Sequence, residues 1–199
     1  RGAAAAAGRE AGPVGLVGHV VHYRCRGWNS ADAGPARDAE WAVDEVVRRY
    51  GDVPVCLVGV DMGGRAALRA GGHPAVHSVV ALAPWLPPGG EPEPVRQLSG
   101  RRVLVVHGTD DARADPELSF RLAERAKKVN REVCRFEVHT DGHRLHQHRD
   151  EVSALVVDFV LGSLYGRGFS RPVADALAAP PPLGLRMPLA AGFGRALRG

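Results

Sequence analysis

The stretch Leu57-Val58-Gly59-Val60-Asp61-Met62-Gly63-Gly64-Arg65 decides the fold class of this chain. The apolar run at 54–58 predicts a short buried strand, and a helical pattern follows Asp61. Glycines around the turn let the strand and helix backbones approach closely. The start of the helix places free N–H groups and partial positive charge beside the Asp61 carboxylate. We therefore expect Asp61 to project from the carboxyl edge of a sheet, although glycines and an aspartate also make ordinary turns.

The pattern extends in both directions from this turn. Valine-rich runs alternate with amphipathic segments, which is typical of a parallel sheet covered by helices. The sequence therefore predicts an α/β protein with an open, mostly parallel sheet. The predicted strands are 14–23, 54–58, 76–82, 102–106 and 132–138, and the predicted helices are 36–50, 62–69, 116–128 and a last one from about 149.

The composition changes after Tyr165. Residues 166–199 contain Pro172, Pro188 and the run 180–182 among scattered glycines, which is typical of loops. Only residues 189–197 have helical spacing. The sequence therefore predicts two units: a domain over 1–165 and a Pro/Gly-rich extension over 166–199.

Composition and charge narrow the function classes. A chain of 199 residues fits one domain. No apolar run reaches the roughly 20 residues that span a bilayer, and the alanine-rich start lacks the features of a signal peptide. The 26 basic residues are interspersed with 22 acids and form no stripe, so we expect no nucleic-acid partner. Three cysteines without metal-type spacing, with Cys56 and Cys134 inside apolar runs, predict buried free thiols and a cytoplasmic protein.

Two further groups of polar residues follow predicted strands. His107-Gly108-Thr109-Asp110-Asp111 comes after the strand at 102–106, and Asp141-Gly142-His143 comes after the strand at 132–138. A lone carboxylate or histidine at such a place is usually a turn residue or a solvated side chain. Here Asp61, Asp111 and His143 occur in the order nucleophile, acid and histidine, at three carboxyl strand ends. We therefore expect these three side chains to meet.

Residues 14–165 resemble the α/β-hydrolase superfamily, in particular small esterase-like or dienelactone-hydrolase-like members from actinobacteria. The resemblance implies that Asp61 occupies the nucleophile position, Asp111 is the orienting acid and His143 is the base. It also implies that the Met62 N–H is an oxyanion-hole donor, that the substrate is a small molecule, and that no cofactor or metal is needed. The stretches that carry it are Tyr23-Arg24-Cys25-Arg26-Gly27-Trp28, 57–65, Ala81-Leu82-Ala83-Pro84, 107–111 and Gly142-His143.

The nucleophile position departs from the family pattern. Similar proteins have serine in Gly-x-Ser-Met-Gly-Gly, whereas this chain has Asp61. Aspartate at that position occurs in epoxide hydrolases and in haloalkane or haloacetate dehalogenases. A carboxylate can attack an sp³ carbon to form an ester, which water activated by His143 would hydrolyse. Those families carry a helical cap, yet only residues 85–101 are available here, so we expect no sizeable cap domain.

The front of the fold is a second departure. No strand ending in His-Gly precedes Val14, although that strand normally supplies the second oxyanion donor. Pieces of the tail, 179–183, 186–188 and 193–197, resemble what relatives carry just after that strand. The fold is therefore either permuted or incomplete at the front, with an unrelated extension as the alternative. In the permuted case the alanine-rich head continues a helix, and residues 180–197 pack near Val14 and Asp61, within one chain or across a homodimer.

Three functions remain open. The first is a hydrolase acting on an epoxide, a carbon–halogen bond, or an ester or lactone. The second is a catalytically inactive α/β-hydrolase-like binding protein, because the serine and the oxyanion strand are missing. The third is a metal site formed by His139, Asp141, His143, His146 and His148, although their spacing does not match a zinc motif.

Overall fold

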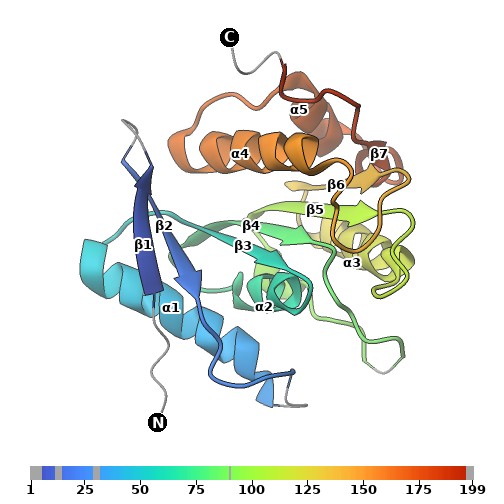
Figure 1. The fold of residues 1–199 in the computed structure, drawn as a ribbon. Coiled ribbons are helices and arrows are strands. Elements are labelled where there is room, and N and C mark those ends of the chain that lie inside the picture. Colours follow the sequence, from blue (N-terminus) through green and yellow to red (C-terminus); the bar gives the residue numbers. More distant parts are fainter. Residues whose placement is uncertain (1–5, 12–14, 29–31, 90, 196–199) are drawn as a thin grey trace.

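The computed structural model describes residues 6–11, 15–28, 32–89 and 91–195 (Figure 1). Its main sheet has five parallel strands in the order β3-β4-β5-β6-β7. The predicted open α/β sheet is confirmed. The strands are β3 (Val55–Val60), β4 (Val76–Leu82), β5 (Arg102–Gly108), β6 (Val133–Val138) and β7 (Met187–Pro188).

Helices cover both faces of this sheet (Figure 1). On one face, α1 (Gly34–Tyr50), α2 (Met62–Ala70) and α3 (Pro116–Val129) enclose an apolar core with β4 and β5. On the other face, α4 (Arg149–Tyr165) and α5 (Arg171–Ala178) enclose a second core. The strands between these cores are apolar on both faces, because both faces are covered. Within the described residues, no helix is long and apolar enough to cross a membrane.

The helix starts follow their sequence signals. The Asp115 carboxylate accepts a hydrogen bond of 2.9 Å from the Glu117 N–H, and Pro116 occupies the first position of α3. Both features satisfy or remove N–H groups that have no partner within a helix. Between β4 and β5 the described residues contain only a 3₁₀ turn at Arg96–Leu98. The expected lack of a helical cap is confirmed for this segment.

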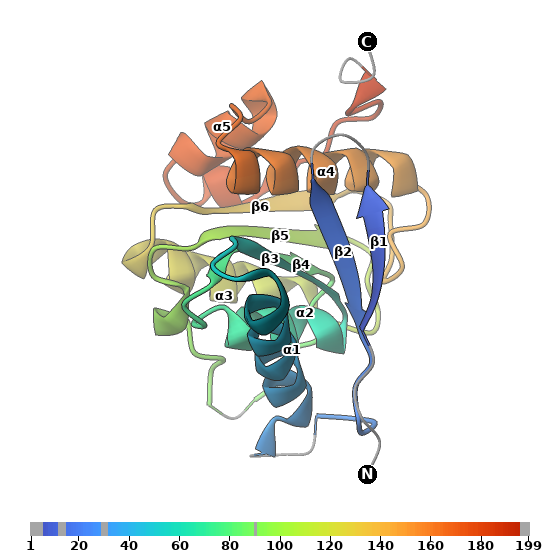
Figure 2. The same cartoon turned by 90° about the vertical axis from the view of Figure 1, so that its left-hand side faces the viewer.

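The predicted strand at 14–23 is wrong in its pairing. Only Leu16–Val21 forms a strand, β2, and it pairs antiparallel with β1 (Ala6–Ala11) in a separate two-stranded sheet, while Val14 lies outside the described residues. The expectation that the alanine-rich head continues a helix is also wrong for residues 6–11. The hairpin gives each strand hydrogen-bond partners for its backbone. Figure 2 shows this hairpin beside the main sheet, and the described sheets contain no strand paired with the outer edge of β3.

The tail forms more structure than its composition predicts. Helix α5 was not expected, because the Pro/Gly-rich composition of 166–199 indicates loops. Pro172 lies in the first turn of α5, where proline is tolerated. The predicted helix over 189–197 is wrong in its described part, which forms turns. The expected packing of 180–197 near Val14 concerns a residue outside the described ones, and the expected packing near Asp61 is wrong for Met187 and Pro188. Met187 and Pro188 pair with β6, and β7 lies at the opposite end of the sheet from β3.

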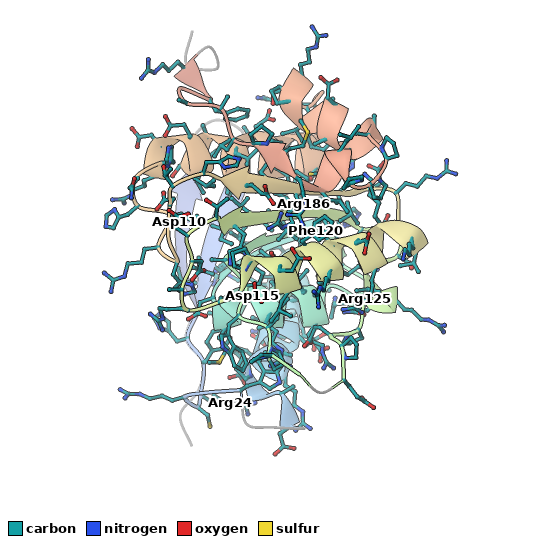
Figure 3. All side chains as sticks on the ribbon, turned by 90° about the vertical axis from the view of Figure 1, so that its right-hand side faces the viewer. Arg24, Asp110, Asp115, Phe120, Arg125 and Arg186 are labelled. Carbon is teal, nitrogen blue, oxygen red and sulfur yellow. The ribbon has the colours of Figure 1, made fainter. Side chains whose placement is uncertain are left out.

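The tail completes the second core. Val173, Ala176 and Leu189 are buried against residues of β6 and α4. The open edge of β6 explains this position, because the Glu137 carbonyl accepts a hydrogen bond of 2.9 Å from the Leu189 N–H. In Figure 3, Arg186 of the tail lies beside Phe120 of α3, and its guanidinium carbon is 3.8 Å from the centre of that ring.

Candidate active site

The turn between β3 and α2 holds Asp61 in a strained conformation. Its φ of 55° and ψ of −121° lie where residues other than glycine are rare. The turn is tight because Gly59 packs against the first turn of α2. A Cβ at Gly59 would lie 2.1 Å from the Gly63 carbonyl oxygen, a separation that real Cβ atoms essentially never show. The strand–turn–helix arrangement predicted around Asp61 is therefore present, with Asp61 at its tip.

Hydrogen bonds fix this turn from both sides. The Asp61 N–H donates to the Leu82 carbonyl at 3.0 Å, and the Asp61 carbonyl accepts from the Trp85 N–H at 3.1 Å. Four residues into α2, the buried Arg65 pairs with Glu93 at 2.7 Å. Its guanidinium carbon lies 3.8 Å from the centre of the Trp28 ring. These contacts hold the segments that contain Trp28 and Trp85 against α2, so the backbone around Asp61 is fixed.

His143 lies between the two aspartates. Its Nδ1 is 2.8 Å from Asp111 Oδ2, and its Nε2 is 3.6 Å from Asp61 Oδ1. A carboxylate only accepts hydrogen bonds, so Nδ1 carries the proton and Nε2 of the neutral ring has a free lone pair. The distance to Asp61 slightly exceeds that of a direct hydrogen bond, so the Nε2 lone pair is available to another donor. The structure thus brings together all three side chains named from the sequence.

Asp111 is the most enclosed member of this group. Its Oδ1 accepts from the Arg113 and Ala114 N–H groups at 2.8 and 3.0 Å. Its Oδ2 lies within hydrogen-bond distance of His143 and also of His107. Burial alone would raise the pKa of Asp111, but the hydrogen bonds from Ala114, His143 and Arg113 outweigh it and lower this pKa below its ordinary value. Asp111 is therefore an ionised, fully hydrogen-bonded partner for His143.

The loop after β6 is shaped by Asp141. The Asp141 carboxylate accepts from the backbone N–H groups of Gly142, His146 and His148 at 2.9, 3.1 and 3.0 Å. Its role is therefore to order the loop that presents His143. In the described part of the chain, no three His, Cys, Asp or Glu side chains form a group that could hold a metal ion. The alternative of a metal site in this loop is not supported.

Hydrogen-bond donors near Asp61 come from α2 and from the segment after β2. Met62 is the first residue of α2, where backbone N–H groups have no acceptor within the helix. The Tyr23 hydroxyl lies 3.2 Å from the position of a Cβ built at Gly63. Burial and then the nearby charge of Asp38 raise the Tyr23 pKa, so its hydroxyl stays protonated at neutral pH. Sequence reasoning gave Tyr23 no role, because nothing placed its loop beside the turn at Asp61.

The comparisons with known proteins concern the fold. No protein-family model matches the chain, and no curated protein matches it. Among solved structures, an esterase from Pyrococcus furiosus, Pf2001, matches with a TM-score of 0.63 at 16% identity over 75% of this chain and 72% of the esterase. A monoacylglycerol lipase from Paleococcus ferrophilus matches with a TM-score of 0.57 at 17% identity, over 73% of this chain and 84% of the lipase.

A third match names the architecture. MGS-MChE2, an alpha/beta hydrolase enzyme from a lagoon-sediment metagenome, matches with a TM-score of 0.53 at 14% identity, over 73% of this chain and 78% of that chain. This chain has the α/β-hydrolase fold. In this α/β-hydrolase fold, Asp61, Asp111 and His143 follow β3, β5 and β6, so they share the carboxyl edge of the sheet.

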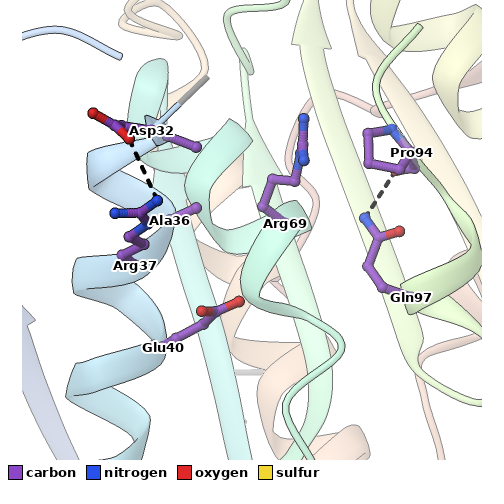
Figure 4. Close-up of a pocket in the computed structure, with 8 residues that line it drawn as sticks. Asp32, Ala36, Arg37, Glu40, Arg69, Pro94 and Gln97 are labelled. Atoms are coloured by element: carbon purple, nitrogen blue, oxygen red, sulfur yellow. Dashed lines mark hydrogen bonds and ion pairs between the residues drawn. The ribbon is translucent and has the colours of Figure 1, made fainter. Parts of the chain in front are cut away.

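Two cavities in the described part of this α/β-hydrolase fold lie away from the three candidate residues. One, of about 310 Å³, lies between α1, α2 and the turn at residues 94–97 (Figure 4). The other, of about 440 Å³, lies along the outer face of α4. The Asp61 side chain is 37% exposed. The Asp61 side chain is thus partly open to solvent, whereas Asp111 is enclosed behind His143.

Proposed function

We propose that the chain is a hydrolase in which Asp61 is the nucleophile, His143 activates water and Asp111 orients His143. The observation that carries this proposal is the position of His143, with Nδ1 at 2.8 Å from Asp111 and Nε2 facing Asp61 at 3.6 Å. The strained turn at Asp61 gives further support, since such conformations cluster at functional sites. The solved structures with a similar fold include an esterase and a lipase by name.

The geometry supports a reaction in two steps. An Asp61 carboxylate oxygen attacks an sp³ carbon, so that an ester C–O bond forms and the bond to the leaving group breaks. A halide leaves as an anion, whereas an epoxide oxygen leaves as an alkoxide and takes up a proton. His143 Nε2 then removes a proton from water, which attacks the ester carbonyl. The intermediate then expels the substrate oxygen, which takes the proton from His143 and leaves as the alcohol, and the Asp61 carboxylate is regenerated.

Epoxides and carbon–halogen bonds fit this nucleophile better than esters or lactones. Attack on an sp³ carbon forms no tetrahedral acyl oxyanion in the first step, so it does not require the two backbone donors of an oxyanion hole at that stage. In the second step the charge develops on the carbonyl oxygen of Asp61 itself, beside the free N–H groups at the start of α2. Attack on an ester or lactone would instead form an anhydride with Asp61, which makes such substrates the less favoured class.

The exposure of the site favours a second candidate function. Small-molecule sites usually enclose most of the ligand, yet the Asp61 side chain is 37% exposed, and the two cavities described above lie away from it. A catalytically inactive α/β-hydrolase-like binding protein would retain the fold and the buried Asp111 without turnover. The two candidates differ in one measurable property, which is formation of an ester at Asp61.

Heavy-oxygen labelling tests the proposal. After several turnovers of an epoxide or haloalkane in ¹⁸O-water, we expect heavy oxygen in the Asp61 carboxylate, detected by mass spectrometry of the peptide that contains it. Asp61→Asn abolishes the ester and the turnover, allowing for slow deamidation. Asp110→Asn is the matched control, because Asp110 is exposed and adjacent to Asp111. Turnover without label in Asp61, or undiminished turnover by Asp61→Asn, would contradict the proposal.

A further inference from the structure

A chain of buried polar side chains runs through the core beside the candidate site. His107 on β5 and Ser119 on α3 are fully buried, and Arg135 on β6 is 1% exposed. All three lie on the face of the sheet that α3 covers, among apolar residues of the first core. Burying such groups is costly unless each is hydrogen-bonded, so their partners must be accounted for. None of the three has a role in the proposed reaction itself.

The contacts of His107 determine where its proton lies. Its Nε2 is 3.1 Å from Asp111 Oδ2 and 3.0 Å from the Ala114 carbonyl oxygen, and both atoms can only accept. Nε2 therefore carries the hydrogen. His107 Nδ1 is 2.8 Å from the Ser119 hydroxyl. In the neutral ring Nδ1 is an acceptor, so it accepts a hydrogen bond from the Ser119 hydroxyl.

The contacts of Ser119 agree with this direction. Arg135 Nε, which can only donate, lies 3.1 Å from Ser119 Oγ. Ser119 Oγ lies 2.8 Å from the Pro116 carbonyl oxygen as well as 2.8 Å from His107 Nδ1, so its single proton can be donated to either acceptor. The Pro116 carbonyl also receives a hydrogen bond of 3.1 Å from Arg135 Nη2, which leaves the Ser119 proton available to His107. The three hydrogen bonds of this series then run in one direction: Arg135 donates to Ser119, Ser119 donates to His107, and His107 donates to Asp111.

We propose that His107 is the positioning residue of this site. Its Nε2–H donates to the Asp111 carboxylate and fixes that carboxylate, while Ser119 and Arg135 hold His107 in place. The inference rests on the proposed roles of Asp111 and His143. Asp111 Oδ2 is shared by His107 on one side and His143 on the other. Loss of the bond from His107 leaves Oδ2 free to move away from His143. The Nδ1–H tautomer of His143, which provides the basic Nε2, is then no longer enforced.

The charges around His107 keep it in the neutral form that this role requires. Burial, and then the positive charge of Arg135, lower the His107 pKa, while the negative charge of Asp111 acts in the opposite sense. Hydrogen bonds in a dry interior strengthen one another when they donate in series. A neutral His107 in such a series is a stronger donor to Asp111 than an isolated imidazole.

The tail anchors the far end of this chain of hydrogen bonds. Arg135 Nη1 donates to the Leu185 carbonyl at 3.0 Å and to Glu137 at 2.8 Å. Glu137 in turn pairs with Arg186 of the tail at 3.0 Å. The tail therefore holds the Arg135 guanidinium, which is the first donor of the series. We expect removal of the tail to loosen Asp111 as well.

Nitrogen NMR of histidine-labelled protein tests the proposal without a substrate. The ring ¹⁵N shifts of His143 report its tautomer. In the parent protein we expect the neutral His143 ring in the Nδ1–H form alone. His107→Phe retains an aromatic side chain but removes both nitrogens, and should give a mixture with the Nε2–H form. His107→Gln, which offers an amide donor, should restore part of the Nδ1–H form. His146→Phe, on an exposed side chain, is the control and should change nothing.

The kinetic consequence is a slower second step. We expect His107→Phe to slow hydrolysis of the Asp61 ester roughly 10- to 100-fold, the range that loss of an outer hydrogen-bonding partner causes at metal-ligating histidines. The first step, alkylation of Asp61, should proceed at the parent's rate. A folded His107→Phe protein in which His143 remains entirely Nδ1–H overturns the inference.

A second variant covers the case in which His107→Phe does not fold. Ser119→Ala removes one hydroxyl, and should shift the His143 tautomer in the same direction by a smaller amount. An unchanged tautomer in folded Ser119→Ala would then overturn the inference. The proposed function is separable from this result. A tautomer shift in variants of a protein that never forms an ester at Asp61 would refute the proposed function and support the positioning role.

Discussion

Replacing Asp111 by asparagine exchanges one oxygen for an amide at the centre of the site. Asparagine can still accept from the Arg113 and Ala114 N–H groups through its remaining oxygen. Its amide group, however, then faces the N–H donors of His107 and His143. Two hydrogen bonds to a charged group are lost, although His107 Nε2 retains the Ala114 carbonyl as an acceptor and His143 can accept from the new amide in its Nε2–H form. Each hydrogen bond to a charged group contributes about 1.5–3 kcal/mol, so after this partial compensation we expect the free energy of unfolding to fall by roughly 2–4 kcal/mol.

The effect of Asp111→Asn on catalysis should be larger than its effect on stability. The amide favours the Nε2–H form of His143, in which the nitrogen facing Asp61 is no longer a base. In a serine protease the corresponding change of aspartate to asparagine lowers kcat about 10⁴-fold. That factor corresponds to about 5.4 kcal/mol of activation free energy. We expect a similar loss in hydrolysis of the Asp61 ester, with alkylation nearly unchanged, so the ester should accumulate.

The assay is rapid-quench mass spectrometry of the protein during turnover, with Asp110→Asn as the matched control. Acid titration gives an independent check. The Asp111 pKa is lowered in the folded protein, so its stabilising contribution is present above the unfolded-state pKa, near 3.8, and is lost as the pH falls through the folded value. In Asp111→Asn the free energy of unfolding should lack this part of its dependence on pH. Ester hydrolysis within tenfold of the parent's rate would refute the reasoning.

Three further outcomes are expected. His143→Gln should trap the ester at Asp61, because alkylation needs no base whereas hydrolysis does, and His146→Gln should not trap it. An equal loss of ester hydrolysis in both variants, measured by the same mass assay, would reassign the base. A chain ending at Tyr165 should melt far below the full chain or aggregate. It lacks Val173 and Leu185, two fully buried side chains that each contribute about 1.5–3 kcal/mol to the free energy of unfolding. Unchanged melting would contradict this prediction. Gly59→Ala should not fold, since its methyl group would collide with the α2 backbone; soluble protein with the parent's circular dichroism would count against the tight turn.

The sequence predicted those features that depend on local patterns. The strands at 76–82 and 132–138 and the helix capped by Asp115 were found because periodicity and capping are properties of neighbouring residues. Asp61, Asp111 and His143 could be grouped because parallel strands place their carboxyl ends at one edge. Their roles in a reaction remain predictions.

The features that the sequence did not predict depend on long-range pairing. Nothing in residues 6–11 distinguishes a strand paired with β2 from a continuing helix, because alanine favours helices in the absence of a partner strand. The two residues of β7 are too few to show any period, and they form a strand only because the edge of β6 is available. His107 appeared in a motif, but its contacts with Ser119 and Arg135 arise from three separate elements.

The outer edge of β3 has a consequence for handling the protein. Val58 and Val60 are 50% and 55% exposed, and in the described sheets no strand pairs with that edge. Natural sheets usually guard such edges with lysine, proline or a bulge, and the six residues Val55–Val60 contain none of the charged or proline guards. Main-chain groups on an open edge recognise other extended backbones with little regard to their side chains. Concentration, more than temperature, should therefore limit how long this protein remains monodisperse, and a lysine in place of Val58 is the simplest way to extend its working range.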